Sequence, residues 1–175
     1  MDKGLVHIYT GDGKGKTTSS VGLATRALGH GRKVLYVYFH KIPEKYGYNE
    51  IDSLAKLGAT IRGVAKGHPF CDSDLSVDEL SKEAVSGLEE IAKMIEQDEY
   101  DLLVLDESVV SVRDNFLPED KLLDFIDSKP ERLELVMTGR GATEAMIAKA
   151  DYVSNITKVK HPYDRKISAR EGVEF

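Results

Sequence analysis

Short apolar runs alternate with amphipathic stretches along almost the whole chain. Strands are predicted at residues 5–10, 34–39, 60–65, 102–105, 133–137 and 152–156. Helices are predicted at residues 16–28, 49–57, 77–97, 118–126 and 142–150. The clearest helical period is that of Leu80, Ala84, Leu88 and Ile91, whose spacing places them on one face. Strands alternating with helices predict an α/β fold with a mostly parallel sheet.

We expect residues 1–175 to form one domain of three layers, with helices covering both faces of the sheet. The run at residues 102–105 is apolar without interruption, as is typical of a strand buried on both faces. Ligands of such sheets bind beyond the carboxyl ends of the strands. The segments after Thr10, Phe39, Leu105 and Met137 should therefore surround one site. The tail from residue 158 has little periodicity, and we expect it to lie over the site or the surface.

Composition excludes several classes of protein. The formal net charge of -6 argues against a broad basic surface for nucleic acid. No apolar run approaches the ~18–20 residues that span a bilayer. The first residues enter a strand directly, which leaves no room for a signal peptide. The single cysteine, Cys71, allows no internal disulfide and favours a reducing compartment, so we expect a cytoplasmic protein.

A glycine-rich loop joins the first strand to the first helix. Residues 10–17 read T-G-D-G-K-G-K-T, which matches the phosphate-loop pattern G-x-x-x-x-G-K-[ST] except that Thr10 replaces the first glycine. Such a loop curls so that several backbone N–H groups face one anion at a helix N-terminus. Lys16 would neutralise phosphate oxygens, and the Thr17 hydroxyl would bind Mg²⁺. The alternative is a Gly/Lys-rich turn that binds no ligand.

Two further segments carry candidate chemistry. Asp106 and Glu107 end the apolar strand, as in a Walker B strand, where one carboxylate holds Mg²⁺ and the next acts near the reacting phosphate. Two solvated acids that cap a strand are the alternative. The adjacent glutamate favours, by analogy of fold, the RecA-like branch of phosphate-loop proteins. Arg140, in a T-G-R-G turn, would pair with phosphate or a carboxylate, or else be a solvated arginine of a tight turn.

Taken together, these segments resemble the corrinoid adenosyltransferases of the CobA/BtuR type. The matching text is Y-T-G-D-G-K-G-K-T-T at residues 9–18, R-A-L-G-H-G at 26–31, L-V-L-D-E at 103–107, T-G-R-G at 138–141, V-K-H-P-Y-D at 159–164 and G-V-E-F at 172–175. The motifs keep the family's order and span nearly the whole chain. The phosphate loop alone would be unspecific, whereas the combination is specific.

The resemblance implies transfer of the 5′-deoxyadenosyl group of ATP to the Co(I) of a reduced corrinoid. Cobalt attacks the ribose C5′, and the whole triphosphate leaves, so the protein contributes positioning and electrostatics rather than water activation. The family implies Mg²⁺ (or Mn²⁺), cobalamin or a cobinamide-type precursor as substrate, a reduced flavoprotein as electron donor and a homodimer. It implies neither nucleic acid nor membrane as a partner.

The family's residue roles fall on matching positions. The triphosphate would be held by residues 10–18, which are Thr10, Gly11, Asp12, Gly13, Lys14, Gly15, Lys16, Thr17 and Thr18. Lys14 and Lys16 would offset its negative charge. Thr17 and Glu107 would both coordinate the Mg²⁺. Asp106 would be either a further ligand or a group that hydrogen-bonds to a ligand and orients it. Arg26 matches a position that the family keeps basic, and a helix-surface arginine is the alternative.

The chain departs from the family on the corrinoid side. Family members place an aromatic pair, often with Trp, beneath the corrin, and this chain has no Trp. Phe70 is the best candidate for that wedge, and a plug in the core is the alternative. The segment His40-Lys41-Ile42-Pro43 also differs from the usual F-x-K-G. Two rival functions follow: a RecA-like ATPase that acts on nucleic acid, and a non-catalytic nucleotide- or corrinoid-binding regulator.

Overall fold

The computed structural model describes residues 3–68 and 76–174. A central sheet of six parallel strands runs through the molecule in the order β3-β2-β4-β5-β1-β6. The strands are β1 (Val6–Thr10), β2 (Val34–Phe39), β3 (Thr60–Val64), β4 (Leu102–Asp106), β5 (Glu134–Thr138) and β6 (Tyr152–Asn155). The predicted α/β fold with a sheet between helices is confirmed, and the sheet is parallel throughout.

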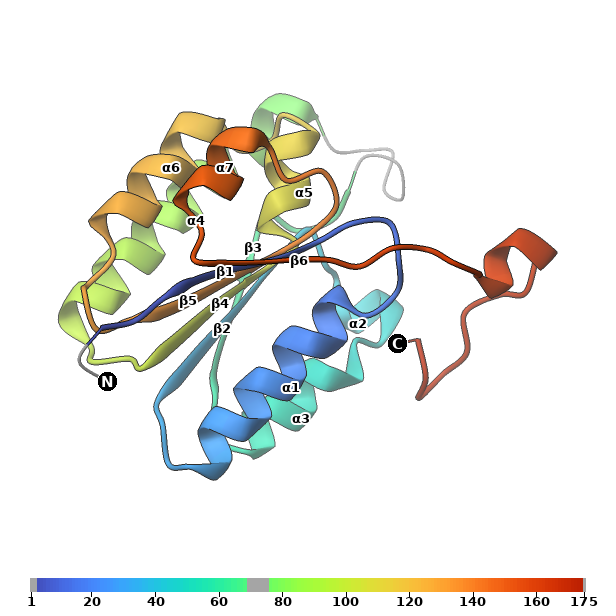
Figure 1. Ribbon diagram of the computed structural model, residues 1–175, viewed down its shortest axis with the longest axis horizontal. Helices are drawn as coiled ribbons and strands as arrows, with labels where there is room; N and C mark the ends of the chain where they lie inside the picture. The colour runs from blue at the N-terminus through green and yellow to red at the C-terminus, as the bar shows by residue number, and fades with distance from the viewer. Residues whose placement is uncertain (1–2, 69–75, 175) are drawn as a thin grey trace.

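Helices cover both faces of the sheet (Figure 1). One face carries α1 (Lys16–Gly29) and α3 (Asn49–Lys56); the other carries α4 (Val77–Gln97), α5 (Ser108–Arg113), α6 (Glu119–Ser128) and α7 (Glu144–Lys149). The two short remaining helices are α2 (Pro43–Tyr46) and the 3₁₀ turn η1 (Pro162–Arg165). This layering is the three-layer arrangement that the alternating pattern predicts, and it matches the fold of phosphate-loop proteins.

Successive side chains along each strand point to opposite faces of the sheet, and they form two hydrophobic cores. In β2, Leu35, Val37 and Phe39 face the larger core with α4 to α7, whereas Val34 and Tyr36 face the core under α1 and α3. All five residues are fully buried. β2 and β4 are therefore apolar on both faces because each lies between helical layers. This burial fixes the carboxyl ends of the two central strands, where the site is built.

The predicted elements agree with the structure to within one or two residues at most ends. β4 and β5 extend one residue further than predicted, to Asp106 and Thr138, and Pro118 caps α6 rather than lying in its first turn. α7 is shorter at its start because the Thr143 hydroxyl caps it by accepting a hydrogen bond from Met146 N. The expected loop at residues 67–73 lies mostly outside the described residues, with Phe70 and Cys71.

Three elements carry no clear sequence signal. α2 and η1 are single turns, each with a proline in its first turn. α5 begins immediately after β4, with Glu107 in the left-handed region (φ 65°) as the residue between strand and helix. Its sequence, S-V-V-S-V-R, is rich in β-branched residues that favour strands, so packing against the sheet overrides local preference.

Candidate nucleotide-binding site

The glycine-rich loop is held against the chain that leaves β6. Gly13 N donates a hydrogen bond to Ile156 O (2.7 Å), and Ile156 N donates to Thr10 O (2.8 Å). A side chain at Gly11 would collide with Asn155 and Ile156, and its φ of 98° is itself a glycine conformation. These contacts explain why small residues occupy the loop, which is curled by its neighbours as well as by its own sequence.

Thr10, which stands where the common pattern has glycine, is nearly buried and makes a specific contact. Its hydroxyl accepts a hydrogen bond from Ala142 N (3.3 Å), just after the T-G-R-G turn. The threonine therefore ties the phosphate loop to the segment that follows β5. A glycine at this position would lose that tie, so the departure from the pattern has a structural function.

Lys16 lies inside the loop. Its Nζ donates hydrogen bonds to Gly11 O (2.8 Å) and Gly13 O (2.7 Å), and the residue is 8% exposed. Burial lowers the pKa of the Lys16 ammonium, and the positive charge of Arg140 acts in the same direction. The loop thus holds a buried cation at the N-terminus of α1, which is the arrangement that binds phosphate oxygens.

Asp106 is the centre of a buried polar network. Its Oδ1 accepts hydrogen bonds from the hydroxyls of Thr17 (3.0 Å) and Thr138 (2.7 Å), and its Oδ2 is ion-paired with Lys41 Nζ (2.7 Å). The Thr138 hydroxyl in turn accepts from Glu107 N (3.0 Å). The side chain of Asp106 has no exposed surface. The network joins α1, β2, β4 and β5 at one point.

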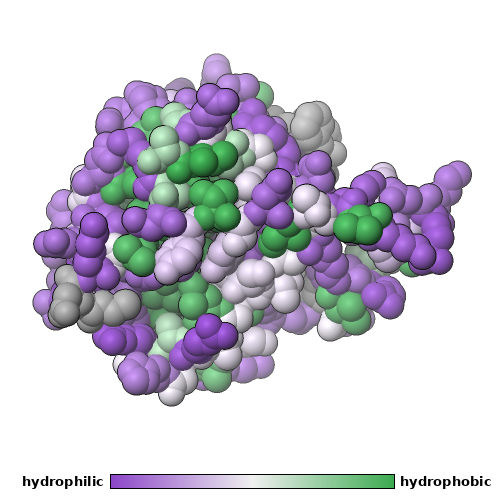
Figure 2. Space-filling model, viewed as in Figure 1, coloured by the Kyte–Doolittle hydropathy of each residue, from purple (hydrophilic) through white to green (hydrophobic). Residues whose placement is uncertain are grey.

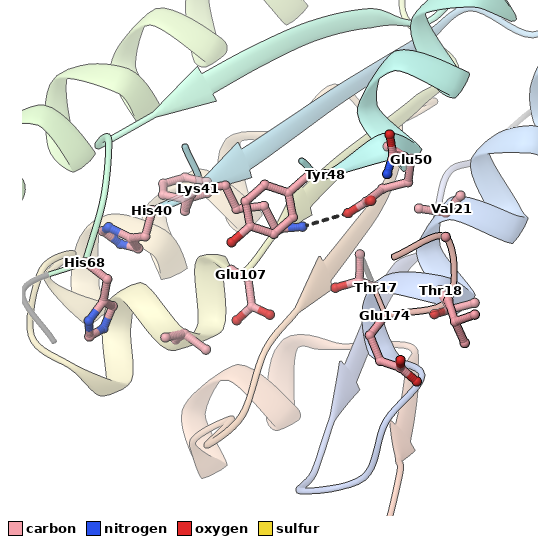
Figure 3. A pocket seen from close by; sticks show the side chains of 15 residues that line it. Thr17, Thr18, Val21, His40, Lys41, Tyr48, Glu50, His68, Glu107 and Glu174 are labelled. Carbon is pink, nitrogen blue, oxygen red and sulfur yellow. Dashed lines mark hydrogen bonds and ion pairs between the residues drawn. The ribbon is translucent and has the colours of Figure 1, made fainter. Parts of the chain in front are cut away.

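Glu107 differs from Asp106 in its surroundings. It lines both cavities of the site, and burial raises the pKa of its carboxyl, with the adjacent Asp106 adding to the effect. Lys41, Lys16 and Arg140 act in the opposite direction. The left-handed backbone at Glu107 turns the chain between strand and helix, and Figure 3 shows its carboxylate among the side chains that line the cavity.

The oxygen donors here fit Mg²⁺. Thr17, Asp106 and Glu107 supply a hydroxyl and two carboxylates, which are the hard ligands that Mg²⁺ prefers. Within residues 3–68 and 76–174, no group of three or more His, Cys, Asp or Glu side chains is arranged to hold a metal ion. These side chains do not complete a coordination shell by themselves, so phosphate oxygens or water would have to supply the remaining ligands of a bound Mg²⁺.

Two cavities of about 550 and 540 Å³ adjoin at the carboxyl ends of the strands. The second cavity contains the phosphate loop together with Arg140. The first extends to the end of β2 and the start of α3 (Figure 3). Residues that line both are Thr17, Thr18, His68, Glu107, Val110, Val173 and Glu174. One connected space therefore runs from the phosphate loop to the end of β2.

The structure brings most of the predicted residues together. Lys14, Arg140 and Thr18 are exposed and line the second cavity. Asp12 is exposed, and it does not line either cavity. Arg26 lies in the last turn of α1, ten residues or about 15 Å along the helix from Lys16, and also lies outside both cavities. Phe70 lies outside the described residues.

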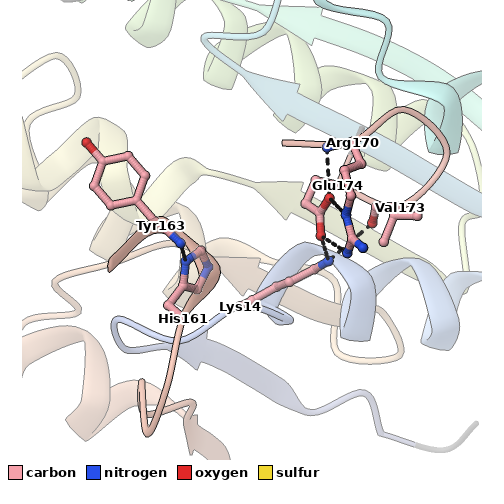
Figure 4. Close-up of polar contacts among 6 residues, drawn as sticks. All are labelled: Lys14, His161, Tyr163, Arg170, Val173 and Glu174. Atoms are coloured by element: carbon pink, nitrogen blue, oxygen red, sulfur yellow. Dashed lines mark hydrogen bonds and ion pairs between the residues drawn. The ribbon is translucent and has the colours of Figure 1, made fainter. Parts of the chain in front are cut away.

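The C-terminal tail returns to this site. It extends from the body after β6 and folds back, so that the chain ends near α2 (Figure 1). Glu174 Oε1 is paired with Lys14 Nζ (2.9 Å), which also donates to Val173 O (3.2 Å) (Figure 4). Hydrogen bonds from Arg170 and Lys14 hold the pKa of the Glu174 carboxyl well below its usual range. The tail thus contacts the phosphate loop through exposed charges.

The segment after Phe39 lies at the site, as its place at the end of a strand predicts, and it contributes His40 and Lys41, for which the sequence indicates no function. His40 has a positive φ (58°) and is almost buried; its Nδ1 donates to Gly67 O (3.2 Å), so its Nε2 accepts from the Ser111 hydroxyl (2.9 Å). Burial lowers the pKa of His40 to about 4. Lys41 is the partner of Asp106. Two signals were available in the sequence: the position of these residues at the end of a buried strand, and Phe39-His40-Lys41, which keeps the F-x-K of the family's F-x-K-G.

The fold and the site define a nucleotide-binding α/β protein of the phosphate-loop class. A sequence profile of the family described as ATP:corrinoid adenosyltransferase BtuR/CobO/CobP matches residues 2–175. The chain therefore belongs to the ATP:corrinoid adenosyltransferase family, as the motifs of the sequence predicted. No helix in the described part of the chain combines the length and apolarity needed to cross a membrane.

Curated relatives agree with this assignment. The chain is similar to the corrinoid adenosyltransferase of Escherichia coli strain K12, at 30% identity over 174 residues, covering 99% of this chain and 87% of that protein. It is 32% identical over 174 residues to the corrinoid adenosyltransferase of Pseudomonas aeruginosa, covering 99% and 85% of the two chains. Corrinoid adenosyltransferase CobA of Salmonella typhimurium is 30% identical over 174 residues, with coverage of 99% and 87%.

Proposed function

We propose that this protein transfers the 5′-deoxyadenosyl group of ATP to the Co(I) centre of a reduced corrinoid and releases triphosphate. The observation that carries the proposal is the connected pair of cavities, one with the phosphate loop and one beyond β2, in a chain of this family. ATP would place its triphosphate in the cavity with the phosphate loop and its ribose toward the cavity beyond β2. The corrinoid, cobalamin or a cobinamide-type precursor, would approach from the side of β2.

The reaction requires a nucleophile, an aligned carbon and a stabilised leaving group. Co(I) donates an electron pair to the ribose C5′, a cobalt–carbon bond forms, and the C5′–O bond breaks with its electrons leaving on the triphosphate. The chain contributes Lys16 inside the loop, with Lys14 and Arg140 beside it, to stabilise the charge that develops on the leaving oxygen. Because the nucleophile is supplied by the second substrate, the site needs no base to activate water.

Mg²⁺ (or Mn²⁺) would be held by Thr17 and Glu107 together with phosphate oxygens, and would supply further charge stabilisation to the triphosphate. Support comes from the hard oxygen donors at the cavity and from the raised pKa of Glu107, which marks a carboxylate that gains from a nearby cation. Phe70 remains our candidate for the apolar wedge beneath the corrin.

We also propose a homodimer, supplied with electrons by a reduced flavoprotein, in the cytoplasm. Ile147, Tyr152 and Val153 support an interface between two copies, because they are between 41% and 53% exposed on α7 and the edge strand β6. Figure 2 shows hydrophobic side chains gathered on this face. The mass of the protein in solution, measured by sedimentation, tests this assignment. The single cysteine, which is typical of a reducing compartment, supports the cytoplasmic location.

Product analysis tests the activity. The protein is incubated with ATP, Mg²⁺ and chemically reduced cobalamin, and we expect inorganic triphosphate together with the absorption spectrum of an alkylcobalamin. Lys16→Ala should reduce the rate by about 10²–10³-fold, because a buried cation that faces the leaving group is lost. Lys56→Ala, a change at an exposed position of α3 outside both cavities, is the matched control. Formation of ADP and phosphate without a spectral change would indicate an ATPase instead.

A further inference from the structure

Lys41 is a buried charge next to the carboxylate of Asp106. Its side chain is 8% exposed at the end of β2, and its Nζ lies 2.7 Å from Asp106 Oδ2 and 3.2 Å from Glu50 Oε1. The ammonium also lies over the ring of Tyr48, 4.7 Å from its centroid. Figure 3 shows the lysine directed toward Glu50, across the cavity from Thr17. Its position joins β2, β4 and the start of α3.

The two oxygens of Asp106 are held differently: Oδ1 is hydrogen-bonded, whereas Oδ2 accepts no hydrogen bond from the described part of the chain and has the ion pair with Lys41. Oδ1 accepts from the hydroxyls of Thr17 and Thr138, and Oδ2 faces Lys41. A carboxylate that is buried, paired and doubly hydrogen-bonded is stable without a metal ion. The Thr17 hydroxyl directs its proton to Asp106, which leaves its lone pairs for a cation on the other side. Asp106 therefore orients Thr17 rather than binding the cation.

The charge balance follows from these pairs. A divalent cation next to Asp106 would meet the Lys41 ammonium within a few ångströms, in a buried environment that screens charges poorly. Lys16 and Arg140 add positive charge around Glu107. The described residues hold no cluster of three or more His, Cys, Asp or Glu side chains that could offset this repulsion. A triphosphate, with its several negative charges, would offset it.

We propose that Lys41 is an internal counter-ion of Asp106 that makes divalent-metal binding conditional on the nucleotide. The protein alone would bind Mg²⁺ weakly, and the metal would enter as a complex with the triphosphate, on Thr17 and Glu107. Lys41 is a positioning residue in this scheme, since it acts through Asp106. The inference rests on the proposed ATP- and metal-dependent function and names the group that couples the two ligands.

The experiment measures Mn²⁺ binding, by the electron paramagnetic resonance signal of the free ion, with and without ATP. In the wild type we expect strong binding only when ATP is present. Lys41→Met removes the counter-ion and should strengthen Mn²⁺ binding in the absence of ATP by at least about tenfold, because the buried negative charge of Asp106, bonded to Thr17 and next to Glu107, is then no longer balanced. Lys41→Arg keeps the charge and should behave as the wild type.

A double variant separates electrostatics from disturbed packing. Lys41→Met with Asp106→Asn removes both charges, and the gain of metal binding should disappear. This neutral pair also provides a folded background if Lys41→Met alone unfolds; in that case Lys41→Gln, with circular dichroism as the check on folding, replaces the single variant. Glu50→Gln weakens the second ion pair of Lys41 without removing its charge, and it should leave Mn²⁺ binding unchanged.

Two results would overturn the inference. One is wild-type protein that binds Mn²⁺ equally well with and without ATP. The other is a folded Lys41→Met or Lys41→Gln protein that gains no metal binding over the wild type. Failure of the proposed function looks different: in that case neither ATP nor Mn²⁺ binds to any variant, or both bind and the products are ADP and phosphate.

Discussion

The carboxyl end of the sheet and the C-terminal tail face the same cavities, but the protein holds them by different means. At the end of the sheet, polar side chains are buried and bonded to one another, as Asp106 is to Thr17, Thr138 and Lys41. In the tail, residues 158–174 are almost all exposed, and they contact the phosphate loop through Lys14, which is paired with Glu174 and donates a hydrogen bond to Val173 O. We call the first region the buried junction.

The difference indicates a division of tasks. Low dielectric makes each pair in the buried junction strong when it is satisfied and costly when it is broken, so the junction keeps one geometry. Exposed ion pairs contribute little and exchange readily with water or other ions. The junction is therefore suited to holding the triphosphate in a fixed position. The tail contacts the phosphate loop through exposed pairs, whose loss would cost little stability.

The largest expected effect concerns the pH dependence of stability through His40 in the junction. Burial lowers its pKa to about 4 in the folded protein, below the ordinary value of 6.5. The unfolded chain thus binds the proton first as the pH falls, so the stability that His40 contributes is complete above 6.5 and is lost as the pH falls toward 4. The expected loss is about 3 kcal/mol.

Urea unfolding of the wild type and His40→Gln across this pH range checks the prediction. The variant has no imidazole to protonate, so its free energy of unfolding should fall less steeply between pH ~7 and ~4. His30→Gln, at an exposed position at the end of α1, is the control. Equal slopes for the wild type and His40→Gln would show that protonation of His40 does not oppose folding.

The next largest effect is on the free energy of unfolding, when the buried junction is disrupted at Thr138. Thr138→Val keeps the shape of the side chain but removes the hydroxyl that donates to Asp106 and accepts from Glu107 N. A buried N–H group is then left without its partner, and the free energy of unfolding should fall by about 2 kcal/mol. Urea unfolding measures the change. The exposed Thr157→Val should differ from the wild type by less than about 0.5 kcal/mol, and an equal loss in both would contradict the role of the junction.

The smallest effect belongs to the tail. Glu174→Gln removes the carboxylate that is paired with Lys14, so the lysine is free to contact a triphosphate. ATP should bind slightly more tightly, by less than about threefold, because an exposed pair is weak. Calorimetric titration at low and high salt measures this change, with the exposed Glu171→Gln as control. Weaker binding would mean that the tail carboxylate supports the nucleotide instead of competing with it.

The local motifs of the site are predictable from the sequence because each depends on neighbours along the chain. The loop at residues 10–17 has its glycines and lysines at fixed spacing, and the apolar run before Asp106 identifies a buried strand. The order of strands and helices predicts a parallel sheet, and the order of motifs predicts the adenosyltransferase family. Both predictions are confirmed by the topology and by the family match.

The contacts between residues that are far apart in the chain depend on the tertiary structure. Lys41 and Asp106 are 65 residues apart, and they meet because the strand order places β2 beside β4, with Tyr38 opposite Asp106. Lys14 and Glu174 are 160 residues apart and meet because the tail folds back. No periodicity encodes such contacts, since they depend on strand order and chain reversal. The sequence alone indicates a phosphate-loop motif and an acidic strand end; the order of strands in the folded sheet decides that Asp106 is buried against Lys41, whereas Glu107 lines the cavities.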